Sequence, residues 1–138
     1  MTLARLITVP VALVLLFAAG CGSKSGGGGG SVAPQASTLQ EVADLLRAAG
    51  SDGRAPARVA DLAKFATAYP GAYQAVKSGD VVVVWGAKMA GEGEAASAAA
   101  NVIAYEKDAP TSGGYVLFTN GEVKQMTADE FKSAPKAK

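Results

Sequence analysis

The pattern of hydrophobic and polar positions divides the chain into three parts. Residues 6–17 (LITVPVALVLLF) are apolar apart from a threonine and a proline, and residues 22–35 (GSKSGGGGGSVAPQ) show no hydrophobic periodicity. From Ser37 onward, apolar positions recur at the intervals that helices and strands require. We therefore expect one globular domain over residues 37–138, and we expect the two preceding parts to lie outside it.

The domain begins with a pattern typical of an amphipathic helix. Thr38 and Glu41 have the spacing of a capping box at a helix start. Four apolar residues then recur on one helical face: Leu39, Val42, Leu46 and Ala49. Gly50 is expected to end this helix in a left-handed conformation.

Two more helices and two strands are expected next. The pattern predicts a helix over residues 57–68 and another that begins at Pro70 and ends at Gly79. The run VVVVW at residues 81–85 predicts a strand covered on both faces, because five β-favouring residues follow one another. Residues 102–105 (VIAY) predict a further strand.

The clearest local pattern lies in residues 115–126 (YVLFTNGEVKQM), where an Asn-Gly pair separates two apolar runs. Asn-Gly favours a two-residue type I′ hairpin turn, because both central residues need positive φ. That turn pairs Phe118 with Val123 and leaves Leu117 on the outer face. Because side chains alternate along a strand, three side chains are then expected on the core face: Val116, Phe118 and Val123.

A short final helix is expected to start at the cap residue Thr127 and to run through Phe131, followed by a solvated tail at residues 135–138. The whole pattern predicts an α+β fold, in which N-terminal helices pack on an antiparallel β-meander of about four strands and a short helix closes the chain.

The N-terminal part has the organisation of an export signal. Arg5 supplies the positive charge, residues 6–17 supply the apolar region, and small residues follow. The apolar run is shorter than the ~20 residues that a helix needs to span a bilayer. We therefore interpret residues 1–20 as a signal peptide that is removed from the mature protein.

The chain's only cysteine, Cys21, directly follows three small residues at positions 18–20 (AAG). This arrangement resembles the lipobox of bacterial lipoproteins, although Ala18 stands where leucine is more usual. The resemblance implies that the thiol receives a diacylglyceryl group, that the signal is cut just before Cys21, and that the new amine can be acylated. An ordinary type I cleavage and a free cysteine are the alternatives. Residues 21–36, which include five consecutive glycines, then form a flexible tether.

Charge and composition narrow the classes of function. The chain has 13 basic and 12 acidic residues, a balance that argues against nucleic-acid binding. It has no histidine, which removes Ser-His and Cys-His nucleophile systems and the commonest metal ligand. Glu92 and Glu94 lie in a Gly/Ala-rich stretch that leaves them solvated, and Ser78 next to Lys77 lacks the spacing of acyl-serine enzymes. We therefore expect no catalytic activity, no cofactor and no metal site.

The C-terminal hairpin carries a second resemblance. Residues 110–123 (PTSGGYVLFTNGEV) are similar to the His-x9-Asp-Gly segment of prepilin-like proteins of planctomycetes. Pro110 stands where that family has histidine, and Asn120 stands where it has aspartate. The resemblance implies a hairpin at the end of a pilin-type α+β domain. The chain as a whole resembles a small planctomycete lipoprotein.

These features predict a lipid-anchored interaction or structural module of the cell envelope that is not an enzyme. Its domain is expected outside the cytoplasm, with an envelope protein as its partner. Gly22, where an aspartate would favour the inner membrane, favours the outer membrane in a bacterium with two membranes. The alternative is an envelope lipoprotein that binds a small ligand or a polysaccharide. The candidate residues for a partner or ligand surface, together with a predicted loop at residues 86–97, are Trp85, Lys88, Tyr105 and Tyr115. Ligand binding requires these aromatic side chains to be exposed together in a concave site.

Overall fold

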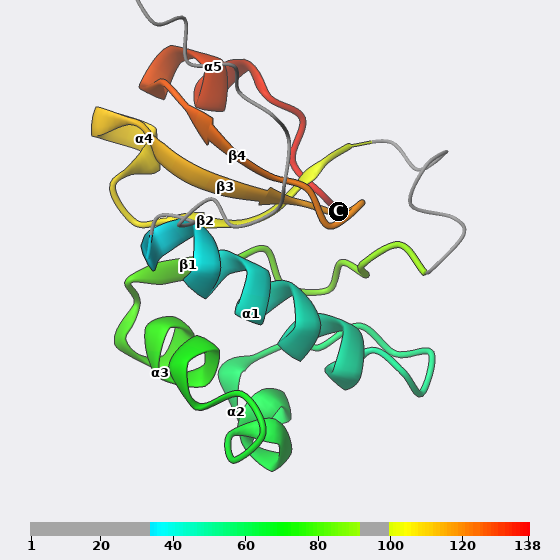
Figure 1. Ribbon diagram of the computed structural model, residues 1–138. Helices are drawn as coiled ribbons and strands as arrows, with labels where there is room; N and C mark the ends of the chain where they lie inside the picture. Colours follow the sequence, from blue (N-terminus) through cyan, green and yellow to red (C-terminus); the bar gives the residue numbers. More distant parts are fainter. Residues whose placement is uncertain (1–33, 92–99) are drawn as a thin grey trace, which may run out of the picture. The chain divides into compact units, whose positions relative to one another are not determined.

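The computed structural model describes residues 34–91 and 100–138 (Figure 1). The predicted signal peptide, Cys21 and the glycine tract lie outside the described residues, as do residues 92–99, which include residues 92–97 of the predicted loop. The four strands form one antiparallel sheet in the order β1-β2-β3-β4: β1 Val81–Val83, β2 Val102–Glu106, β3 Gly114–Phe118 and β4 Val123–Met126.

Helices cover both faces of this sheet. On one face lie α1 (Pro34–Ala49), α2 (Val59–Leu62), the 3-10 turn η1 (Ala63–Phe65) and α3 (Pro70–Ser78). The short helices α4 (Ala109–Ser112) and α5 (Ala128–Ser133) lie on the other, and Figure 1 shows α1 below the sheet and α5 above it. The predicted α+β fold with an antiparallel four-stranded meander and a short C-terminal helix is confirmed.

Two separate hydrophobic clusters hold these layers together. The main core includes Leu39 and Val42 of α1, Ile103 of β2 and Leu117 of β3. The smaller cluster, on the opposite face, contains Val102, Ala109, Val116, Phe118 and Phe131. Because both faces of the two central strands are covered, β2 and β3 carry apolar runs rather than a clean alternation of apolar and polar residues.

The first helix begins earlier than predicted and ends before Gly50 as predicted, but without the predicted left-handed conformation. α1 begins at Pro34, and Thr38 lies inside it, where its hydroxyl donates to the Pro34 carbonyl at 3.0 Å. Residues 34–36, expected in the tether, therefore belong to the helix, because proline is favoured in a first turn. Gly50 does not take positive φ; its N–H donates to the Leu46 carbonyl at 2.9 Å, and the left-handed residue is Gly53, with φ of 85°.

The next helices match their predictions in part. The helix expected over residues 57–68 is reduced to α2 and η1. α3 begins at Pro70 and ends at Gly79, which has φ of 83°, as expected. The strand expected over residues 81–85 is shorter, and it lies at the edge of the sheet with Val82 only half-buried, so coverage of both faces is not complete there.

The β3–β4 hairpin is paired one residue away from the predicted register. Leu117 lies opposite Val123. The Phe118 N–H donates to the Glu122 carbonyl, and the Gly121 N–H donates to the Phe118 carbonyl, both at 2.9 Å. The loop therefore has three residues, with Gly121 at φ of 87° in the position of a left-handed bulge residue. Positive φ at Gly121 is confirmed, and the two-residue turn is wrong.

This shift exchanges the faces that the sequence assigned. Leu117 and Val123 face the main core, whereas Val116 and Phe118 face the smaller cluster. The prediction that Val116, Phe118 and Val123 share one core face is therefore wrong, and Leu117 is fully buried rather than outside.

Alanine at Gly121 is expected to destabilise the protein about as much as alanine at Gly53. Both glycines have φ near 85°, where a side chain costs about 1 kcal/mol. A Cβ at Gly121 would overlap the Arg47 guanidinium, but this is the end of a flexible, 38% exposed side chain that can move aside. Urea unfolding should therefore show similar losses for Gly121→Ala and Gly53→Ala. A much larger loss for Gly121→Ala that vanishes when Arg47 is also replaced by alanine would contradict this expectation.

The C-terminal residues are not a solvated tail. Thr127 caps α5 as predicted, with its hydroxyl accepting from the Glu130 N–H at 3.3 Å. Beyond α5, the Val102 N–H donates to the Pro135 carbonyl at 2.8 Å, and the Ala137 N–H donates back to the Val102 carbonyl at 2.9 Å. Residues 135–137 thus pair with the sheet, and Ala137 is buried.

Candidate functional site

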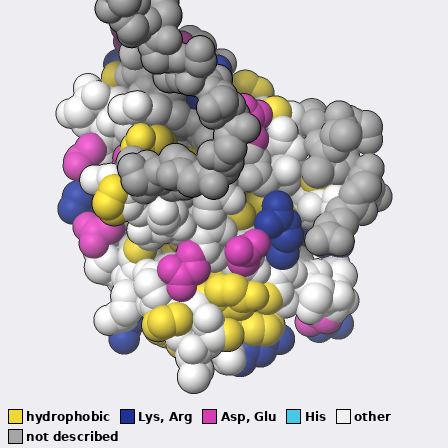
Figure 2. All heavy atoms as spheres, viewed as in Figure 1, with side chains coloured by type: hydrophobic (Ala, Val, Ile, Leu, Met, Phe, Trp, Pro, Cys, Tyr) yellow, Lys and Arg dark blue, Asp and Glu magenta, His cyan; other side chains and the backbone are white. Residues whose placement is uncertain are grey.

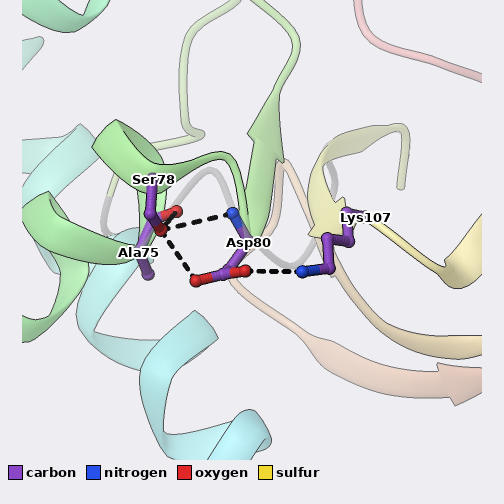
Figure 3. Close-up of polar contacts among 4 residues, drawn as sticks. All are labelled: Ala75, Ser78, Asp80 and Lys107. Atoms are coloured by element: carbon purple, nitrogen blue, oxygen red, sulfur yellow. Dashed lines mark hydrogen bonds and ion pairs between the residues drawn. The ribbon is translucent and has the colours of Figure 1, made fainter.

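A polar cluster joins the end of α3 to the first two strands (Figure 3). The Asp80 carboxylate lies at its centre and accepts from Lys107 Nζ at 2.8 Å and from Ser78 Oγ at 2.7 Å. The Lys107 N–H also donates to the Asp80 carbonyl at 3.0 Å, so the contact continues the pairing of β1 with β2. The cluster borders an open groove of about 620 Å³ that α3 shares with Thr38 of α1.

The electrostatics of this cluster favour a structural role. Hydrogen bonds from Lys107 and Ser78 hold the pKa of Asp80 below its ordinary value, and Asp80 in turn raises the pKa of Lys107. A carboxylate with a lowered pKa is a weak base, and both oxygens of Asp80 already accept hydrogen bonds. Asp80 is therefore poorly suited to activate Ser78 as a nucleophile, and the cluster instead fastens α3 to the sheet.

Acidification is expected to remove the contribution of Asp80 to stability. Because its folded pKa lies below the ordinary value of 3.8, that contribution is full above pH 3.8 and is lost as the pH falls through the folded pKa. The free energies of unfolding of the wild type and of Asp80→Asn should differ by a constant amount near neutral pH and converge in acid. The difference should be small, because the pair is exposed. A difference that persists unchanged in strong acid would contradict this account.

The other shifted groups also have structural causes. The Ala57 N–H lowers the pKa of Asp61 at the start of α2, and the Thr127 N–H lowers the pKa of Glu130 at the start of α5. Burial lowers the pKa of Lys136, whose Nζ lies 4.0 Å from the centre of the Phe131 ring. Lys136 also donates to the carbonyls of Phe131 and Ala134, at 2.5 and 2.9 Å. These groups cap helices or fasten the C-terminal segment.

The predicted surface residues do not form one site. Trp85 and Tyr115 pack against the main core. Tyr105 lies on the opposite face of the sheet, where its ring is 4.6 Å from that of Phe131, centre to centre. Lys88 is exposed beyond β1. All three aromatic side chains are partly buried, and Tyr105 is separated by the sheet from the other two, so this arrangement does not favour the ligand-binding alternative.

Lys88 borders a small hollow that the sequence did not indicate. The hollow has a volume of about 260 Å³ and lies between the end of α1 and residues 88–91. Arg47 lines it from α1 and is held by Asp44 at 3.0 Å. The Ala90 N–H donates to the Thr119 carbonyl at 2.7 Å and ties the segment to the β3–β4 loop. Arginine is common in the last turn of a helix because its charge interacts favourably with the helix dipole. The position of Arg47 in the sequence therefore did not indicate a hollow.

Residues 34–91 and 100–138 contain no group of three or more His, Cys, Asp or Glu side chains that could hold a metal ion. Within the same ranges, no helix is both long and apolar enough to cross a membrane. No protein-family model matches the chain, and comparisons with curated proteins and with solved structures found no match.

Proposed function

We propose that this protein is a bacterial lipoprotein, anchored to a membrane through a lipid on Cys21, whose α+β domain is a non-enzymatic interaction module of the cell envelope. The observation that carries the proposal is the position of the chain's only thiol, directly after an apolar run and three small residues. Lipid transfer needs a thiol nucleophile, and cleavage needs small neighbours. In this setting the lone cysteine has a specific chemical use.

The non-enzymatic part of the proposal is supported by the places of the ionisable groups whose pKa values are shifted. The groups with shifted pKa values belong to helix caps, to the contact between α3 and the sheet, and to the C-terminal segment: Asp61, Asp80, Lys107, Glu130 and Lys136. Catalytic acids, bases and nucleophiles often have shifted pKa values and lie together in one cleft. In this domain the shifts are accounted for by contacts that stabilise the fold, which favours a binding or structural role.

The lipid itself would hold the protein on the membrane. Each buried methylene contributes about 0.8 kcal/mol, so two acyl chains on Cys21 give stable attachment, which a single chain does not. The domain then lies outside the cytoplasm, with an envelope protein as its partner, and Gly22 favours the outer membrane over the inner one.

Palmitate labelling and detergent partitioning test the proposal. Wild-type protein made in a bacterial host should incorporate labelled palmitate and enter the detergent phase of Triton X-114, and Cys21→Ala should lose both properties. Ser23→Ala, a matched change two residues away, should keep both. Wild-type protein that stays in the aqueous phase without label would overturn the proposal.

A further inference from the structure

Three aromatic side chains form a half-exposed surface between η1 and α3. Phe65, Tyr69 and Tyr73 follow one another at intervals of four residues. The Tyr69 N–H donates to the Phe65 carbonyl and the Tyr73 N–H donates to the Tyr69 carbonyl, both at 3.0 Å, so the turns that carry the three rings follow directly on one another. Each side chain packs partly against the main core and leaves part of its surface in solvent. With the exposed Ala68 and Pro70, they make up what we call the aromatic face.

Lysine side chains border the aromatic face. Lys64 Nζ lies 4.8 Å from the centre of the Phe65 ring, and Lys77 Nζ lies 5.9 Å from the centre of the Tyr73 ring. Figure 2 shows hydrophobic side chains gathered on the lower part of the view, where Figure 1 places α2 and α3, with basic side chains beside them. Tyrosines and lysines of this kind are typical of surfaces at the boundary between water and lipid, where the rings enter the headgroup layer and the amines stay hydrated.

The position of Pro34 limits how far the anchor can lie from the aromatic face. Pro34, the first residue of α1, stands thirteen residues after Cys21, which allows at most about 45 Å of extended chain. Glu41 lies about 10 Å from Pro34 along the axis of α1, because each helical residue advances about 1.5 Å. Gly71, next to Pro70 of the aromatic face, lies against the Glu41 carboxylate. A bilayer that holds Cys21 is therefore within reach of the aromatic face.

We infer that the aromatic face docks the domain on the bilayer to which Cys21 is anchored. This inference rests on the proposed function. Three half-buried rings expose far less apolar surface than the ~800 Å² per partner of a stable protein complex. A tethered domain does not need that area, because its tether keeps the lipid surface at an effective concentration in the millimolar range. The surface therefore fits a membrane better than a protein that binds from solution.

The charges around the aromatic face predict how docking depends on salt and on lipid charge. Charges of both signs surround the aromatic face: Lys64 and Lys77 stand near Glu41, whose carboxylate lies against Gly71, and near Asp61, which pairs with Arg58 at 3.5 Å. Docking should therefore depend on apolar burial and change little with salt or with the fraction of anionic lipid.

Site-specific fluorescence on the full acylated protein tests the inference. The protein is reconstituted in phosphatidylcholine vesicles with one added cysteine, labelled with NBD: Ala68→Cys on the aromatic face, or Ser133→Cys on α5 as the control. NBD at position 68 should show blue-shifted emission and several-fold weaker quenching by iodide than NBD at position 133. Adding Tyr69→Ser and Tyr73→Ser should restore quenching at position 68, with circular dichroism confirming that the domain stays folded.

The outcomes separate this inference from the proposed function. Vesicle-bound protein with equal quenching at the two positions would overturn docking and leave the anchor intact. Protection at position 68 that survives the two serine substitutions, or that appears only when a second protein is added, would also overturn it. Wild-type protein that reacts with the dye at Cys21 and stays free of vesicles would overturn the proposed function itself.

Discussion

Replacing Leu117 by alanine is expected to lower the free energy of unfolding by about 2–5 kcal/mol. Leu117 is fully buried in the main core, where β3 packs under α1, and it lies opposite Val123 in the neighbouring strand. Removing its side chain leaves a cavity that the surrounding side chains can fill only in part. Urea unfolding measures the loss.

Lys124→Ala is the matched control for this prediction. Lys124 is exposed on β4, one position from Val123, and its replacement should change the free energy of unfolding by less than about 0.5 kcal/mol. A small loss for Leu117→Ala would instead support the two-residue turn that Asn120-Gly121 suggests, with Leu117 on the outer face. The pair of variants therefore decides the register of the hairpin.

Phe131→Ala is expected to cost about 3–5 kcal/mol, because Phe131 anchors the smaller cluster on the other face of the sheet. Its side chain is buried, its ring contacts Tyr105, and Lys136 lies over it. Its loss therefore frees both α5 and the C-terminal segment that pairs with Val102. The neighbouring exposed change Lys132→Ala should be nearly neutral. A loss below about 1 kcal/mol in urea unfolding of Phe131→Ala would contradict the burial of this second face.

The strand order and several element ends were predictable because their signals are local. Gly79 ends α3 through its own backbone freedom, and Thr127 caps α5 through a hydrogen bond within one turn. The hairpin register was not predictable, because Asn-Gly fits both a two-residue and a three-residue loop. Alternation could not decide between them, since residues 116–118 are all buried.

The remaining differences arise from contacts between distant parts of the chain. The sequence predicts a solvated tail at residues 135–138, yet residues 135–137 pair with Val102 of β2. Tyr105 and Tyr115 read as one candidate surface, but they lie on opposite faces of the sheet because side chains alternate along paired strands. The aromatic face was missed as a surface although its four-residue spacing is visible in the sequence, because half-exposed rings cannot be told from buried ones without the fold.

Mass spectrometry of the mature N-terminus tests the central claim, the lipid on Cys21, most directly. Trypsin cleaves after Lys24, so a lipoprotein should yield a peptide of residues 21–24 (CGSK) that carries a diacylglyceryl group on its sulfur. Its mass and its retention in organic solvent identify the modification. We expect this lipidated peptide and no peptide that joins residue 20 to residue 21. A peptide in which Cys21 has a free thiol, or an intact peptide of residues 6–24, would contradict it.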